Sequence, residues 1–157
     1  MNKKKILIFF LISFLSGCGF KAYNKLDLIK FNITEIETSG DKRVNYKLKN
    51  SILENLKKNN DNNDYKLSIA STKNRSIKEK NINNQVTKYE INIIVKVQLI
   101  DNINKKVLKF QLTEKKEFSA TKQHSKLINE EKRVVEQIAE ILSEKIIDKL
   151  IEETNDI

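Results

Sequence analysis

Residues Lys88–Ile100 read KYEINIIVKVQLI, and their alternation of apolar and polar side chains is the strongest indication of the fold. Lys, Glu, Asn and Gln fill most of the positions between its alternating apolar residues, and Ile94 and Ile100 are the exceptions. The alternating residues are Tyr89, Ile91, Ile93, Val95, Val97 and Leu99. A period of two is typical of a β-strand with one buried face and one solvated face. Such a strand usually belongs to an antiparallel sheet.

The residues after this stretch predict a second strand beside it. Asp101–Lys105 is polar and typical of a hairpin loop. Val107–Phe118 then restores the alternation, with Leu108, Phe110 and Leu112 expected to point inward. We therefore expect an antiparallel hairpin whose two strands bury the same face.

Two further strands are predicted on the N-terminal side. Residues 29–33 (IKFNI) alternate between apolar and polar, and Tyr65, Leu67 and Ile69 repeat that period. The basic segment Ser71–Lys80 comes next. From the sequence it is either a link to the strand at 88–100 or an extension of one of the two strands that flank it.

Two amphipathic helices are predicted from periods of three and four residues. The first follows Ser39–Asp41, which offers a helix cap, and stops at the polar loop 59–64; the second runs from Lys126 to about Glu152. The apolar stripes are Val44, Leu48, Ile52 and Leu56 in the first helix and Ile128, Val135, Ile138, Leu142, Ile146 and Leu150 in the second. The paired acids Glu130 and Glu131 are assigned to the solvated face.

The element order predicts an α+β fold. We expect a two-layer sandwich, β-α-β-β-β-α, in which a mostly antiparallel four-stranded sheet carries two amphipathic helices on one face. The expected domain is 28–153, followed by a short tail at 154–157. One domain of this length can bury a modest core.

The N-terminus predicts export and lipid attachment. Lys3–Lys5 precede the apolar run Ile6–Leu15, and Leu15-Ser16-Gly17 leads into Cys18, the only cysteine. This layout is typical of a lipoprotein signal peptide, which predicts cleavage of 1–17, lipidation of Cys18 and a tether over 18–27. The apolar run is shorter than the roughly 20 residues that cross a bilayer. The alternative is an ordinary signal peptide followed by an incidental cysteine.

Three acyl chains on Cys18 would anchor the protein stably in a membrane, since more than one chain is enough for that. Gly19 follows the cysteine, where an Asp would resemble an inner-membrane retention signal. We therefore expect anchoring at the periplasmic face of the outer membrane. Nucleic acid is not an expected partner in that compartment.

Charge is unevenly distributed along the chain. Residues 126–157 hold five basic and nine acidic residues, although the whole chain carries a net charge of +9. The basic excess therefore lies upstream, which favours an anionic partner such as a phosphorylated lipid. Lys73, Arg75 and Lys78 are the residues we expect to bind lipid A phosphates. The alternatives are a lysine-rich soluble face and a mobile hydrophilic loop.

The sequence offers no catalytic constellation. His124 is the only histidine and falls in the polar connection 119–125, and the three glycines form no phosphate-binding loop. Enzymes need tuned acids, bases or nucleophiles gathered in a pocket. We expect a protein that is not an enzyme and that holds neither a cofactor nor a metal.

Four features of the chain point to a known family: Cys18-Gly19-Phe20 at the predicted mature start, the predicted order of elements, the size and the basic net charge. With these features the chain resembles the LptE family of lipopolysaccharide-assembly lipoproteins. The resemblance implies a sandwich that plugs the large LptD β-barrel and supports the assembly of that barrel. It also implies a role in delivering lipopolysaccharide to the outer leaflet, with Cys18 as the lipidated residue. The alternative is an accessory or structural lipoprotein of another envelope lipid-trafficking or outer-membrane assembly system.

Overall fold

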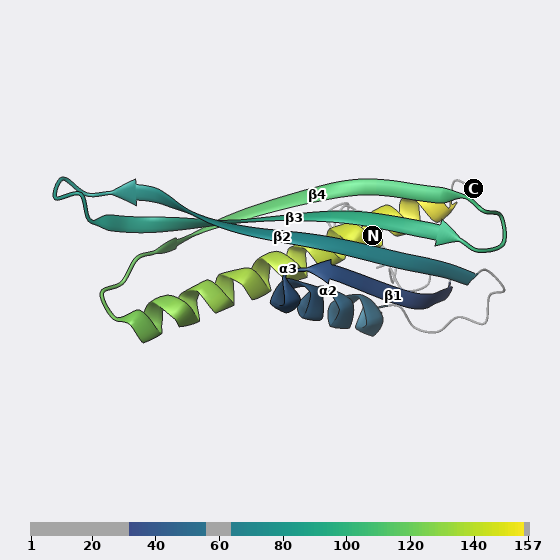
Figure 1. Ribbon diagram of the computed structural model, residues 1–157, viewed down its shortest axis with the longest axis horizontal. Helices are drawn as coiled ribbons and strands as arrows, with labels where there is room; N and C mark the ends of the chain where they lie inside the picture. Colours follow the sequence, from purple (N-terminus) through teal and green to yellow (C-terminus); the bar gives the residue numbers. More distant parts are fainter. Residues whose placement is uncertain (1–31, 56–63, 156–157) are drawn as a thin grey trace, which may run out of the picture.

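The computed structural model describes residues 32–55 and 64–155, and within them it confirms the predicted order of elements (Figure 1). These elements are β1 (Asn32–Gly40), α2 (Lys42–Asn55), β2 (Asp64–Lys80), β3 (Val86–Asp101), β4 (Val107–Ser119) and α3 (His124–Asn155). The signal peptide, Cys18 and the tether, as well as residues 28–31 and the end of the tail, lie outside the described residues.

The four strands form one sheet in the order β1-β2-β3-β4. The pairs β2–β3 and β3–β4 are antiparallel, as expected, and β1 pairs with β2 in parallel. A parallel pair needs a crossover connection, and α2 lies in the segment that links β1 to β2. The sheet is therefore mixed but mostly antiparallel, which confirms the predicted fold class.

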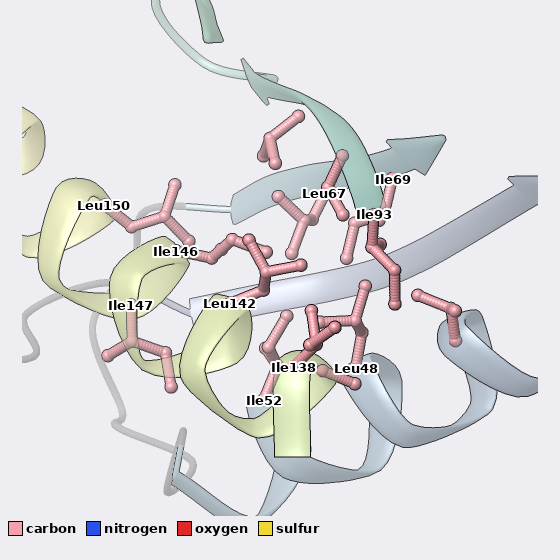
Figure 2. Close-up of a cluster of buried hydrophobic side chains, with 14 of the residues drawn as sticks. Leu48, Ile52, Leu67, Ile69, Ile93, Ile138, Leu142, Ile146, Ile147 and Leu150 are labelled. Atoms are coloured by element: carbon pink, nitrogen blue, oxygen red, sulfur yellow. The ribbon is translucent and has the colours of Figure 1, made fainter. Parts of the chain in front are cut away.

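Both helices pack on the same face of the sheet, and the hydrophobic core lies between the two layers (Figure 2). Its largest fully buried side chains include Leu48 and Ile52 of α2, Ile69 and Ile93 of the sheet, and Ile146 of α3. The helices also meet through hydroxyls, and the distance between the Oγ atoms of Ser51 and Ser143 is 2.7 Å. The period-two and helical stripes of the sequence thus converge on one core.

The turn between β1 and α2 depends on one glycine and one cap. Gly40 has φ +97°, and a Cβ there would lie 1.9 Å from the carbonyl oxygen of Ser71. Asp41 then caps α2, because its Oδ1 accepts the backbone N–H groups of Arg43 at 3.1 Å and Val44 at 3.0 Å. The chain therefore leaves the sheet at Gly40 and enters the helical layer at once.

The segment Ser71–Lys80 belongs to β2, so the alternative of a mobile loop is wrong. Its pairing with β3 continues as far as Lys80 opposite Val86. The turn comes later, at 81–85, where Asn81 Oδ1 accepts the backbone N–H of Gln85 at 2.9 Å. Apolar alternation ends near Ser71, but backbone hydrogen bonding to β3 does not depend on side-chain hydrophobicity.

The last helix differs from its prediction at the N-terminal end. It begins at His124, so this residue is the first of α3 and does not lie in the connecting loop. Ile128, which was predicted to be in the buried stripe, is 39% exposed, and Leu127 packs against the core in its place. The first turns of α3 lie beyond the main core, so the helical period there does not bury a full stripe.

Candidate functional site

The sheet continues past the end of β1, and this part of the molecule holds the candidate site. β1 stops opposite Ser71, whereas β2, β3 and β4 run on toward one end, where α3 begins (Figure 1). We call residues 72–91 and 115–133 the distal end. They include eleven basic and five acidic residues, whereas the remaining described residues include eleven basic and thirteen acidic ones. The basic excess of the described structure is thus concentrated at the distal end.

Lys73 and Arg75 lie together on the helix-covered face of β2. Lys73 Nζ is 3.2 Å from Glu131 Oε1, and Arg75 Nη1 is 2.9 Å from Glu131 Oε2. The Arg75 guanidinium carbon also lies 3.8 Å from the centroid of the Tyr89 ring. Tyr89 stacks in turn on Phe118 with a centroid distance of 5.6 Å. Asp41 Oδ2 lies 4.0 Å from Lys73 Nζ. The Glu131 carboxylate therefore positions both cations, and the two rings hold Arg75.

Lys78 lies on the opposite, open face of the sheet. Its Nζ is 3.3 Å from Glu90 Oε2 and 3.4 Å from Glu117 Oε1, so the cation bridges β2, β3 and β4. The hydrogen bond to Glu90, followed by that to Glu117, raises the pKa of the Lys78 amine. The three residues predicted to bind phosphate thus share one end of the molecule but occupy two faces.

The partners of these cations were not identified from sequence. Glu131 was assigned to the solvated face of its helix, yet its side chain is 20% exposed and faces the sheet. Tyr89 was identified as a buried strand residue, and its role as a platform for Arg75 was missed. A helical period counted from Leu127, which packs against the core, would have placed Glu131 on the inward face.

A second surface feature is a hollow of about 780 Å³ on the open face of the sheet. It crosses all four strands and is lined by side chains such as Glu37, Ser68, Lys96 and Gln111. Beside it, Lys66 Nζ lies 3.2 Å from Glu35 and 2.6 Å from Glu37. The hydrogen bond to Glu37 is the main reason that the pKa of the Lys66 amine is raised. This face combines charged and amide side chains with the exposed apolar side chain of Val107.

The described part of the chain shows no group of residues arranged to hold a metal ion. Among the same residues, neither helix combines the length and the apolar character needed to cross a bilayer. His124 is exposed at the start of α3. The cations of the distal end form ion pairs with carboxylates, which is the chemistry that binding of an anion would use.

Solved structures of other lipoproteins share this architecture. The structure of rare lipoprotein B from Shewanella oneidensis superimposes with a TM-score of 0.61 at 15% identity, covering 78% of this chain and 97% of that one. Lipoprotein B from Nitrosomonas europaea gives a TM-score of 0.53 at 13% identity, covering 80% and 86%. At these identities the likeness establishes the fold. No curated protein matches the chain in sequence.

The decisive comparison is with a sequence model of a protein family. The family described as "LptE: Lipopolysaccharide-assembly" matches residues 28–150, which include the four described strands and nearly all of α3. Its members are lipoproteins of lipopolysaccharide assembly and not enzymes, which agrees with the lack of a catalytic constellation in the sequence. The chain belongs to the LptE lipopolysaccharide-assembly family.

Proposed function

We propose that this protein is an outer-membrane lipoprotein that plugs an LptD-type β-barrel, supports the assembly of that barrel and aids the insertion of lipopolysaccharide into the outer leaflet. The match of residues 28–150 to the LptE family is the observation that carries the proposal. Beyond family membership, the proposal names three partners: the β-barrel, the outer membrane and lipopolysaccharide. Cys18 would supply the lipid anchor at the periplasmic face.

The shape and polarity of the domain support a plug. The interior of a large outer-membrane barrel is polar, so a plug has to present polar surface and keep its own apolar side chains inside. Lys66, Lys96 and Gln111 supply polar groups on the open face of the sheet. The buried face of the sheet is already covered by α2 and α3. We propose that the open face contacts the barrel wall.

The distal end is the proposed contact for lipopolysaccharide phosphates. Lys73 and Arg75 share the Glu131 carboxylate, and a phosphate could take the place of that carboxylate with the same donors. Lys78 would act separately on the other face, because its partners are Glu90 and Glu117. Binding and positioning are the mechanism, and no covalent bond is made or broken.

The proposal is tested by isolating the tagged, lipidated protein from native outer membranes in mild detergent and identifying what remains bound by mass spectrometry. We expect one large β-barrel of LptD type in near-stoichiometric amount. A variant with Cys18→Ser serves as the control for anchoring, and its yield from the membrane fraction should fall. Recovery of the protein alone, or with inner-membrane permease subunits, would contradict the plug and favour an accessory lipoprotein of another system.

A further inference from the structure

Among residues 32–55 and 64–155, no strand pairs with one edge of β2 over the length of the distal end. Pairing between β1 and β2 stops at Gly40 opposite Ser71, and β2 continues from Thr72 to Lys80 with β3 on its other side only. Along this side, no backbone hydrogen bond from a turn, loop or cap of the described residues reaches Thr72–Lys80. We call Thr72–Lys80 the free edge. Such an edge is a template for another strand.

The direction of the backbone groups at the free edge follows from Ser71. The carbonyl oxygen of Ser71 accepts the backbone N–H of Asp41 at 3.2 Å, so the backbone groups of Ser71 point away from β3. Backbone groups of alternate residues in a strand point to the same side. Lys73, Arg75 and Ile77 therefore present their N–H and C=O groups outward, since the irregularity in the β2–β3 register begins only after Ile77.

None of the described residues extends the sheet at this edge. After Gly40, the chain turns into α2 and leaves the plane of the sheet, as described above. The side chains of the free edge are exposed except for that of Lys73, which is half-buried. A strand added here would continue the line of β1 and would lie beside β2 without displacing any described element.

Charge decides what kind of strand fits. The free edge contains four basic residues and Glu79, within a distal end whose net charge is +6. Pairing of two copies through this edge would bring like charges together, which disfavours a homodimer. An added strand with carboxylates at alternate positions would place those carboxylates beside Lys73 and Arg75. Both cations already donate hydrogen bonds to the carboxylate of Glu131, so their positions are compatible with carboxylate partners.

We propose that the free edge of β2 binds an acidic, extended segment of a partner protein, which adds to the sheet as a fifth strand. Main-chain hydrogen bonds to Lys73, Arg75 and Ile77 supply the affinity, and the surrounding cations select for acidic side chains. This inference goes beyond the proposed function, because it requires neither a barrel lumen nor lipopolysaccharide.

The test uses the full-length lipidated chain in detergent micelles and a nine-residue probe peptide of alternating Thr and Glu. Residue-resolved amide hydrogen exchange is measured by NMR with and without the peptide. At a peptide concentration about ten times its Kd, exchange at Lys73, Arg75 and Ile77 should slow by about tenfold, because only the unbound fraction exchanges. The same peptide with Lys in place of Glu should give no protection. Equal protection by both peptides would overturn the charge selection.

A matched pair of variants tests the main-chain contact. Ile77 is 52% exposed, so Ile77→Ala changes little, whereas Ile77→Pro removes the outward N–H at a position where an edge strand tolerates proline. Binding should be lost in Ile77→Pro and kept in Ile77→Ala. A peptide N-methylated at the residues that face β2 should also fail to bind, and this measurement does not depend on the folding of a variant. Binding of the N-methylated peptide, or the lack of amide protection by the acidic peptide, would overturn the added strand.

Discussion

At the scale of single residues, Glu131 has the largest influence on the candidate site. Its carboxylate contacts both Lys73 and Arg75, and all three side chains are partly exposed. Partly exposed ion pairs contribute little to stability, since water screens them. Glu131 therefore contributes little to folding stability. Its main effect is to place a negative charge beside Lys73 and Arg75, where an incoming anion would bind.

We expect Glu131→Gln to strengthen lipopolysaccharide binding by a few fold, because it removes the anion that competes for both cations, and to cost less than about 1 kcal/mol of folding free energy. Binding measured at low salt and urea unfolding check these two expectations. Glu130→Gln is the matched control, since Glu130 pairs with Arg133 of the same helix. Weaker binding in Glu131→Gln would show that Glu131 helps to hold the cations in their binding geometry.

Asp101 should make stability depend on acid pH. Its carboxylate accepts hydrogen bonds from Ile103 N at 2.8 Å and from Asn104 N at 2.9 Å and Nδ2 at 2.8 Å, and the bond from Asn104 N is the main cause of its lowered pKa. A depressed pKa contributes stability above the pKa of the unfolded chain, near 4, and this contribution is lost as pH falls through the folded pKa.

The test is urea unfolding of the wild type and Asp101→Asn between pH 3 and 7. The variant should be less stable by about 1–2 kcal/mol at neutral pH, through loss of hydrogen bonds to a charged acceptor. Its stability should also fall less steeply with acid than that of the wild type. Parallel pH profiles for the two proteins would show that Asp101 does not contribute.

At the scale of elements, the turn from β1 into α2 determines where the sheet narrows. Gly40 allows the chain to leave the sheet next to Ser71, and Asp41 starts the helix there. Because β1 ends at this point, the distal end has three strands and a free edge. The ends of the elements thus decide which surface is available for binding.

We expect Gly40→Ala to destabilise the fold by 2 kcal/mol or more, on the order of what strained backbone positions cost. The positive φ and the close approach to the Ser71 carbonyl both act against a Cβ. Thermal unfolding is the measurement, with Ser39→Ala as the control on the exposed neighbouring position. A Tm for Gly40→Ala within a degree of wild type would contradict this account of the turn.

Two isoleucines of α3 that the sequence places in the same apolar stripe differ in their exposure to solvent. Ile146 is fully buried, whereas Ile128 is 39% exposed. Ile146→Ala should cost about 2–5 kcal/mol, as for other large-to-small core substitutions, and Ile128→Ala should cost under about 1 kcal/mol. Chemical denaturation of the two variants checks this difference, and equal losses would place the first turns of α3 in the core.

At the scale of the whole molecule, charge and hydrophobicity are separated in space. The core lies between one face of the sheet and the two helices, the basic excess lies at the distal end, and the open face carries polar side chains such as Lys96 and Gln111. A lipoprotein of lipopolysaccharide assembly with this layout could meet an anionic lipid at one end and a polar wall along one face. These surfaces do not overlap the core, so binding variants should fold.

Changing Lys73, Arg75 and Lys78 together to Ser should weaken lipopolysaccharide binding at low salt by about tenfold or more, because three phosphate-competent cations are lost. Changing Lys96, Lys106 and Lys109 to Ser is the matched control, since it removes the same charge away from the distal end. Binding is measured on the lipidated chain across a salt series. Equal losses in both triple variants would show a response to net charge, and unchanged binding in the first would exclude these three cations as the contact.

The amino-acid sequence predicted the α+β order of elements and most of the buried positions, since these depend on local periodicity such as the alternation through Lys88–Ile100. It also predicted a helix cap within Ser39–Asp41 and singled out Lys73, Arg75 and Lys78. It did not predict that β1 runs on to Gly40 or that Ile128 is partly exposed. Only the tertiary structure showed that β1 is parallel to β2, that β2 stays paired with β3 as far as Lys80, and that Glu131 pairs with Lys73 and Arg75. These features depend on which distant segments meet, and periodicity along the chain holds no information about contacts between residues as far apart as Arg75 and Glu131.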